Sequence, residues 1–129
     1  MSLETKTRWL LVANAVISWA LSLPGIVDPV GAIAFFGGEE PNYSFLVRLW
    51  SGLVFLFGCL SWEASGDPRG KLALLKYLWI GKAIAAVCVT VGHLAGEASP
   101  SLMGMNVLTN WLWIPPILYC DIALRRRLR

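Results

Sequence analysis

The chain has 129 residues, of which 57% are hydrophobic and 15% are charged, and its formal net charge is +3. Its mean hydropathy of +0.62 lies far from that of a soluble globular domain. This composition excludes a water-soluble enzyme or binding domain and indicates a protein whose mass lies within a lipid bilayer.

Four apolar stretches occupy most of the chain. A helix needs about 20 mostly apolar residues to cross the hydrocarbon core of a bilayer. The stretches that meet this requirement are Trp9–Ile26, Phe45–Trp62, Leu72–Leu94 and Gly104–Ala123. The sequence therefore predicts an all-α fold, a bundle of four transmembrane helices that forms a single domain over residues 1–129.

Basic residues are distributed unevenly between the two sides of these spans. They precede the first span, separate the second from the third and follow the fourth: Lys6, Arg8, Arg69, Lys71, Arg125, Arg126, Arg127 and Arg129. The other two connections carry only acidic charges: Asp28, Glu39, Glu40 and Glu97. The positive-inside rule then places both termini in the cytoplasm. A short arginine run beside a span is typical of a topology anchor, so we expect no nucleic-acid partner.

The first connection contains the pattern of a short helix. Asp28 is a good N-cap, Pro29 suits the first helical position, and Gly37 with Gly38 predicts the stop. Because the residues between them are mostly apolar, we expect an interfacial helix near Asp28–Phe36 on the outer membrane face. Between the second and third spans, Asp67 and Pro68 predict a tight turn.

The order of these motifs resembles that of a family. A first span with Pro-Gly leads to Asp-Pro and a short helix closed by Phe-Gly-Gly (Asp28 to Gly38), and the second span opens Val-Arg-Leu-Trp-Ser-Gly (Val47 to Gly52). An Asp-Pro-Arg turn (Asp67 to Arg69), a third span with Gly-Lys (Gly81, Lys82) and an arginine tail follow. The chain thus resembles small bacterial four-helix membrane proteins of the DoxX-like group. This resemblance implies a multi-pass protein of the inner (plasma) membrane.

Polar residues within the spans mark the candidate site, because they are costly in hydrocarbon and usually face a bundle interior, a cavity or a partner. Helical spacing gives each span one polar face. These faces comprise Asn14 and Ser18; Arg48, Gly52 and Cys59; Lys71, Lys82 and His93; and Asn106, Asn110, Trp113, Ile117 and Asp121. We expect the bundle to turn all four faces inward.

Lys82 lies near the midplane, with no carboxylate of this chain at its depth. Pro115 and Pro116 cannot donate to the carbonyls of Trp111 and Leu112, so they predict a bend near Trp111–Pro115 with space beside Trp113. The lysine is then solvated by freed carbonyls, or it meets an anionic or polar ligand or a partner's carboxylate. For the ligand alternative, the predicted binding residues converge in the outer half of the bundle: Arg48, Lys82, His93, Asn110 and Trp113.

No catalytic or metal-binding pattern is evident. The single His93 and the scattered Cys59, Cys88 and Cys120 do not have the spacing of a metal site, and no cofactor is predicted. Three classes of function stay open. The first is a non-enzymatic accessory or scaffold subunit that packs against other membrane subunits or its own copies. The second is a binder of a lipid, quinone, pigment or other apolar molecule, and the third is a membrane enzyme using Arg48, Lys82 and His93.

Overall fold

The computed structural model describes residues 1–35 and 44–127. In these two ranges every regular element is a helix. The elements are α1 (Leu3–Val27), α2 (Pro29–Phe35), α3 (Ser44–Gly66), α4 (Leu72–Leu94), α5 (Pro100–Asn106), the π-helical turn η1 (Val107–Trp111) and α6 (Ile114–Arg126). Four stretches are long and apolar enough to cross a membrane: α1, α3, α4 and the stretch from α5 to α6. The predicted four-helix membrane fold is therefore confirmed.

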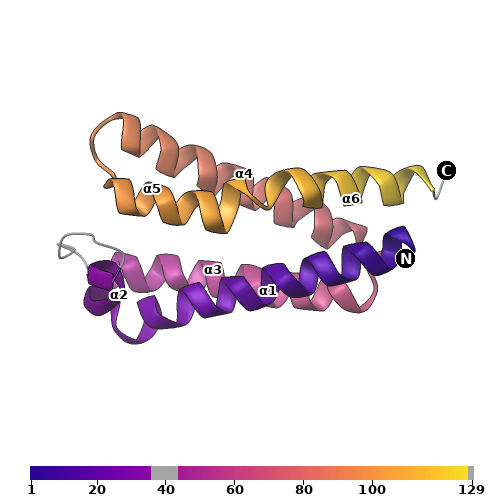
Figure 1. Ribbon diagram of the computed structural model, residues 1–129, viewed down its shortest axis with the longest axis horizontal. Coiled ribbons are helices and arrows are strands. Elements are labelled where there is room, and N and C mark those ends of the chain that lie inside the picture. Colours follow the sequence, from indigo (N-terminus) through magenta and orange to yellow (C-terminus); the bar gives the residue numbers. More distant parts are fainter. Residues whose placement is uncertain (36–43, 128–129) are drawn as a thin grey trace.

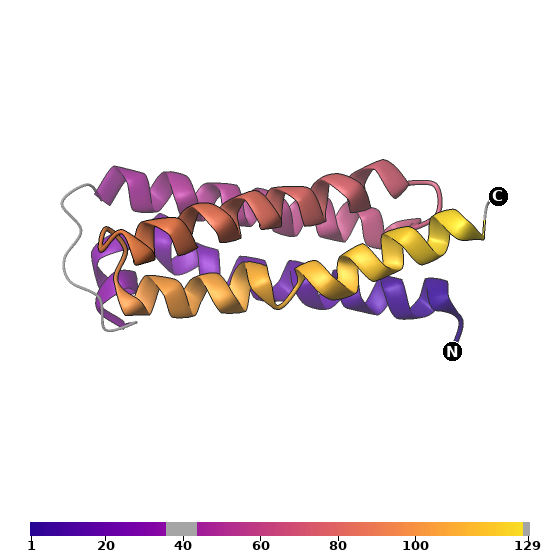
Figure 2. The ribbon, with the colours of Figure 1, turned by 90° about the horizontal axis from the view of Figure 1, so that it is seen from above.

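The helices form two antiparallel pairs that lie side by side, α1 with α3 and α4 with α5 to α6 (Figures 1 and 2). Both termini lie at one end of the bundle, called here the terminal end, and α2 lies at the opposite end. The main apolar core joins the two pairs; its buried members are Leu11, Ala64, Leu75, Leu78, Trp113, Ile117, Cys120 and Leu124.

Small residues bring α1 and α3 together. Gly58 lies so close to α1 that a Cβ atom there would be 2.6 Å from Trp19 Nε1 and 3.2 Å from the carbonyl oxygen of Ala15. Ser61 and Ser65 continue this face of α3 and are buried. Because lipid tails are as apolar as leucine, membrane helices associate largely by such close backbone approach between small residues.

Capping residues extend two spans beyond the predicted boundaries. The Ser2 hydroxyl accepts a hydrogen bond from the backbone of Thr5 (3.1 Å), so α1 begins at Leu3 instead of Trp9. Ser99 accepts from Leu102 (3.2 Å), so the fourth span begins at Pro100 instead of Gly104. Both caps satisfy backbone N–H groups that a helix start leaves unpaired.

The two predicted connections form as the sequence indicates. Asp28 Oδ1 accepts from Gly31 N (3.0 Å) at the start of α2, and Asp67 Oδ1 accepts from Gly70 N (2.9 Å) in the turn before α4. The helix observed after Asp28 is Pro29–Phe35. The predicted stop at Gly37 and Gly38 lies outside the described residues.

Candidate functional site

The polar faces of three spans point inward as predicted, and that of α3 does not. Asn14 and Ser18 on α1 are buried, as is the whole predicted face of the fourth span from Asn106 to Asp121. On α4, Lys82 is buried, whereas Lys71 and His93 at the two ends are half-buried.

For α3 the prediction of an inward Arg48 face was wrong. Arg48 is exposed, and the buried face instead contains Ser51, Gly58, Ser61, Ala64 and Ser65. The physical reason is the close α1–α3 contact, which admits only small side chains on the inner face of α3. A long arginine side chain is excluded from that contact and extends from the surface of the helix.

Lys82 is bonded to the backbone of the interrupted fourth span. Its side chain is only 2% exposed, and its Nζ donates to the carbonyl oxygen of Thr109 at 2.6 Å. Among the described residues, no carboxylate lies within the 4.0 Å of an ion pair with Lys82. The lysine is thus solvated by a freed backbone carbonyl, which is the first of the two roles that the sequence left open.

The π-helical turn frees the carbonyl groups that make these contacts. Leu112 N bonds to Val107 O (3.0 Å) instead of the carbonyl four residues back, which leaves Leu108 O to accept from Trp113 Nε1 (2.8 Å). Trp113 N bonds to Asn110 O (3.0 Å), which leaves Thr109 O to accept from Lys82. A continuous α-helix would use both carbonyls in its own backbone ladder.

The predicted break in the fourth span is therefore confirmed, with a different detail. Pro115 and Pro116 lie in the first turn of α6, where a missing N–H is tolerated. Trp113 is 7% exposed and faces the interior, as predicted. The lysine, however, binds Thr109 and not the carbonyls of Trp111 or Leu112, because the π turn moves the break toward the end of the bundle that carries α2.

Side-chain amides and hydroxyls continue this polar contact between α4 and the fourth span. Asn106 Nδ2 donates to the carbonyl of Ala86 at 3.1 Å, and Asn110 Nδ2 donates to Asn106 Oδ1 at 2.9 Å. The Thr90 hydroxyl donates to Ala86 O (2.7 Å) and accepts from the indole of Trp111 (3.1 Å). We call Lys82, Thr90, Asn106, Thr109 and Asn110 the polar brace. Bonds of Lys82, Thr90 and Asn106 join α4 to the interrupted fourth span, and Asn110 supports Asn106 and Thr109 within that span.

His93 and Arg48 lie apart from the polar brace. His93 Nδ1 is 2.8 Å from the carbonyl of Ala98, so the histidine closes the loop that follows α4. Arg48 has no hydrogen bond or ion pair with any described residue. The structure thus brings Lys82 and Asn110 to one place, with Trp113 one turn away, and leaves Arg48 and His93 out of the predicted convergence.

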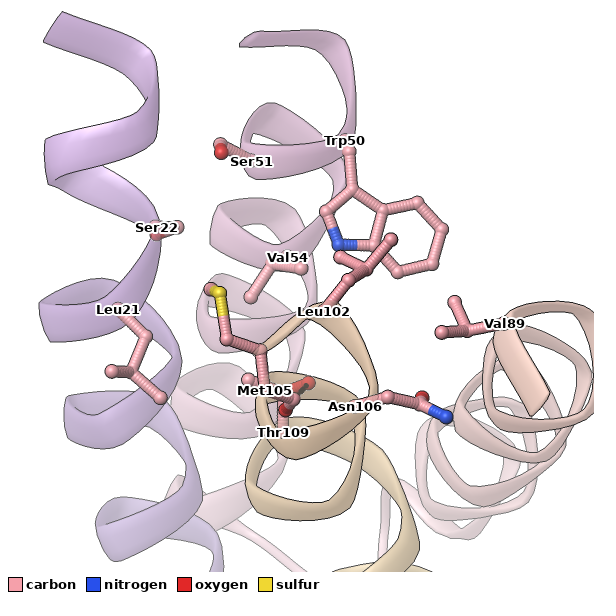
Figure 3. A pocket seen from close by; sticks show the side chains of 10 residues that line it. All are labelled: Leu21, Ser22, Trp50, Ser51, Val54, Val89, Leu102, Met105, Asn106 and Thr109. Carbon is pink, nitrogen blue, oxygen red and sulfur yellow. Dashed lines mark hydrogen bonds between the residues drawn. The ribbon is translucent and has the colours of Figure 1, made fainter. Parts of the chain in front are cut away.

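A small cavity lies between the two helix pairs, beside the polar brace (Figure 3). Its volume is about 20 Å³, which is room for one water molecule. It is lined by Leu21, Ser22, Trp50, Ser51, Val54, Val89, Leu102, Met105, Asn106 and Thr109. None of the five predicted binding residues lines this cavity.

Trp50 and Ser51 give this cavity two unused donors. Figure 3 shows the indole of Trp50 reaching over the cavity from α3, opposite Leu21 and Ser22 of α1. Neither the Trp50 indole N–H nor the Ser51 hydroxyl has a hydrogen-bond partner among the described residues. Neither residue was predicted from the sequence to line a cavity, although a serine next to a tryptophan within a span was the available signal.

Comparisons with protein-family models, with curated proteins and with solved structures found no match to this chain.

Proposed function

We propose that this protein is a small non-enzymatic membrane subunit that packs, as an accessory or scaffold, against another membrane protein. The observation that carries the proposal is the position of Arg48. It is exposed on the surface of α3, four residues inside the helix and without a partner among the described residues. A charged group on the lipid-facing side of a span is costly unless it reaches water or meets an opposite charge.

The surface around Arg48 suits a second helix. Gly52 lies one turn further along the same side of α3, and a Cβ atom at this position would meet nothing within 4 Å. A glycine with open space beside it allows close approach of another backbone, and Arg48 would then bind a carboxylate on that partner. The buried polar side chains are consistent with the same proposal, because Lys82 and Asn110 are engaged within the polar brace.

Site-specific photocrosslinking in the native membrane tests this proposal. A photoreactive amino acid at Gly52 should crosslink to one partner protein in fixed proportion, and Arg48→Gln should abolish that product. The matched control places the same group at Ile84, which is exposed on α4. Crosslinks to lipid alone at both positions, or a partner product that persists in Arg48→Gln, would mean that Arg48 only reaches toward water.

The cavity favours a second candidate function, the binding of an apolar molecule that carries a hydrogen-bond acceptor. Its walls are mainly apolar, and the Trp50 and Ser51 donors point to a carbonyl-bearing ligand. Because the cavity holds about one water molecule, a lipid-sized, quinone-sized or pigment-sized ligand enters only if the two helix pairs separate. Val54→Phe should then reduce the amount of ligand that copurifies in mild detergent, as measured by native mass spectrometry, while Leu53→Phe on the exposed side should not.

An enzyme built on Arg48, Lys82 and His93 receives no geometric support. Lys82 is bonded inside the bundle, His93 closes a loop and Arg48 lies on the surface. General acid–base catalysis requires such groups to lie within hydrogen-bonding reach of one substrate.

A further inference from the structure

Exposed aromatic residues with polar tips form a belt near the terminal end. Each of the four spans contributes one member: Trp9 on α1, Trp62 on α3, Tyr77 on α4 and Tyr119 on α6, and their exposed fractions are 63%, 53%, 63% and 66%. All four lie within about 10 Å, along the helix, of the end of their helix on this side. Exposed tryptophan and tyrosine at matching depth mark the level of the lipid headgroups.

The acidic residues at this end are mostly neutralised within the protein. Glu4 pairs with Arg69 (3.1 Å), Asp121 pairs with Arg125 (2.7 Å) and Glu63 pairs with Lys71. Asp121 also accepts from the indole of Trp79 at 3.1 Å. Asp67 is the remaining described acid here, and it caps its own turn.

The basic residues are not neutralised to the same extent. Five exposed bases at the terminal end have no carboxylate within 4.0 Å among the described residues. Arg8 donates to the carbonyl of Gly66 instead (3.2 Å), and the other four are Lys6, Lys76, Arg126 and Arg127. Lys76 directly precedes Tyr77 of the aromatic belt, Arg126 ends α6 and Arg127 follows it. The terminal end therefore presents a net positive rim at or just beyond headgroup level. At the opposite end, the described charges are the acids Asp28 and Glu97 and the single base Arg48.

We infer that this basic rim, formed by Lys6, Lys76, Arg126 and Arg127 next to the aromatic belt, binds the phosphate headgroups of anionic phospholipids. The belt fixes the depth of the bundle, so the long basic side chains meet phosphate groups without leaving the membrane surface. Each lysine or arginine at such a surface strengthens attraction to anionic lipid by about fivefold. The partner is a lipid because the exposed bases come from three helices, α1, α4 and the end of α6, and do not converge on an enclosed site.

The test uses the full chain in nanodiscs that contain equal amounts of phosphatidylglycerol and phosphatidylcholine. After gentle release, native mass spectrometry measures the ratio of the two lipids that stay bound. The wild-type chain should retain phosphatidylglycerol in clear excess, and higher salt should reduce the excess. The triple variant Lys76→Gln, Arg126→Gln, Arg127→Gln should lower the ratio strongly, by up to about 100-fold if the three contributions are additive.

Arg48→Gln is the matched control, since it removes one positive charge at the other end. It should leave the ratio unchanged, whereas the single variant Lys76→Gln should lower it by up to about fivefold even if the triple variant folds poorly. Equal binding of both lipids by the wild-type chain would overturn the inference. The inference would also be overturned if Arg48→Gln lowered the ratio of bound phosphatidylglycerol to phosphatidylcholine as much as Lys76→Gln does, because net charge alone would then explain the effect.

Discussion

Replacing Gly58 with alanine should destabilise the protein, whereas the same change at Gly52 on the same helix should not. The added methyl at position 58 would lie 2.6 Å from Trp19 Nε1 and 3.2 Å from the Ala15 carbonyl oxygen. The Trp19 ring has little room to move away, because it packs against Phe55 and Trp62 with centroid separations of 6.1 and 5.8 Å. At Gly52 nothing lies within 4 Å of the added atom.

The pair of variants isolates the packing effect. Both gain about 1 kcal/mol of helix propensity from the loss of glycine, and this gain cancels when the two are compared. Overpacking in a tight contact costs about 1–3 kcal/mol, so Gly58→Ala should unfold that much more readily than Gly52→Ala. The free energy of unfolding would be measured by steric trapping or by denaturant titration in mixed micelles. Equal stability of the two variants, or greater stability of Gly58→Ala, would refute the close α1–α3 contact.

Two further predictions concern contacts within the bundle, and a third concerns its orientation in the membrane. Trp113→Phe keeps an aromatic ring but leaves Leu108 O without its donor, so the free energy of unfolding should fall by about 1–3 kcal/mol in the same titration. An unchanged free energy of unfolding would contradict this hydrogen bond. Ser61→Ala removes the acceptor of the buried Asn14 amide and should lower the free energy of unfolding by a similar amount. Combining it with Asn14→Leu should restore stability, because both polar groups are then gone. No recovery in the double variant would argue against their pairing. In a cysteine-free background, Ala98→Cys should react with a membrane-impermeant thiol reagent added outside intact cells, and reaction only after lysis would reverse the predicted orientation.

The sequence was sufficient to predict the four spans, the two Asp-led connections and the buried face of the fourth span. These features depend on the length of each apolar stretch, on capping residues and on helical spacing, all of which can be read directly from a single amino-acid sequence. The helix starts at Leu3 and Pro100 were placed too late, because serine caps extend helices into residues that look polar. Neither the positive-inside orientation nor the DoxX-like resemblance has been tested by the structure, and both stay predictions.

The candidate site was harder to predict, because the depth of a residue in the membrane and the helix face that it occupies do not specify which helices contact each other. Arg48 and Lys82 both lie on polar faces of the sequence, yet only Lys82 turns inward. The decisive fact is that α3 presents its serine and glycine side to α1, and helical spacing alone could not rank that face above the one with Arg48. The π turn at Val107–Trp111 has no simple sequence signature, so the carbonyl of Thr109 was not identified as the partner of the lysine.

Lys82 is bonded inside the bundle to the carbonyl that the π turn frees. Solid-state NMR of the chain in lipid, labelled with ¹⁵N at lysine side chains and ¹³C at threonine carbonyls, measures this contact directly. We expect a short-range correlation between Lys82 Nζ and the Thr109 carbonyl carbon, consistent with the 2.6 Å bond to its oxygen, and the loss of that signal in Lys82→Met. A Lys82 signal that correlates instead with lipid phosphate or with a second protein would contradict it.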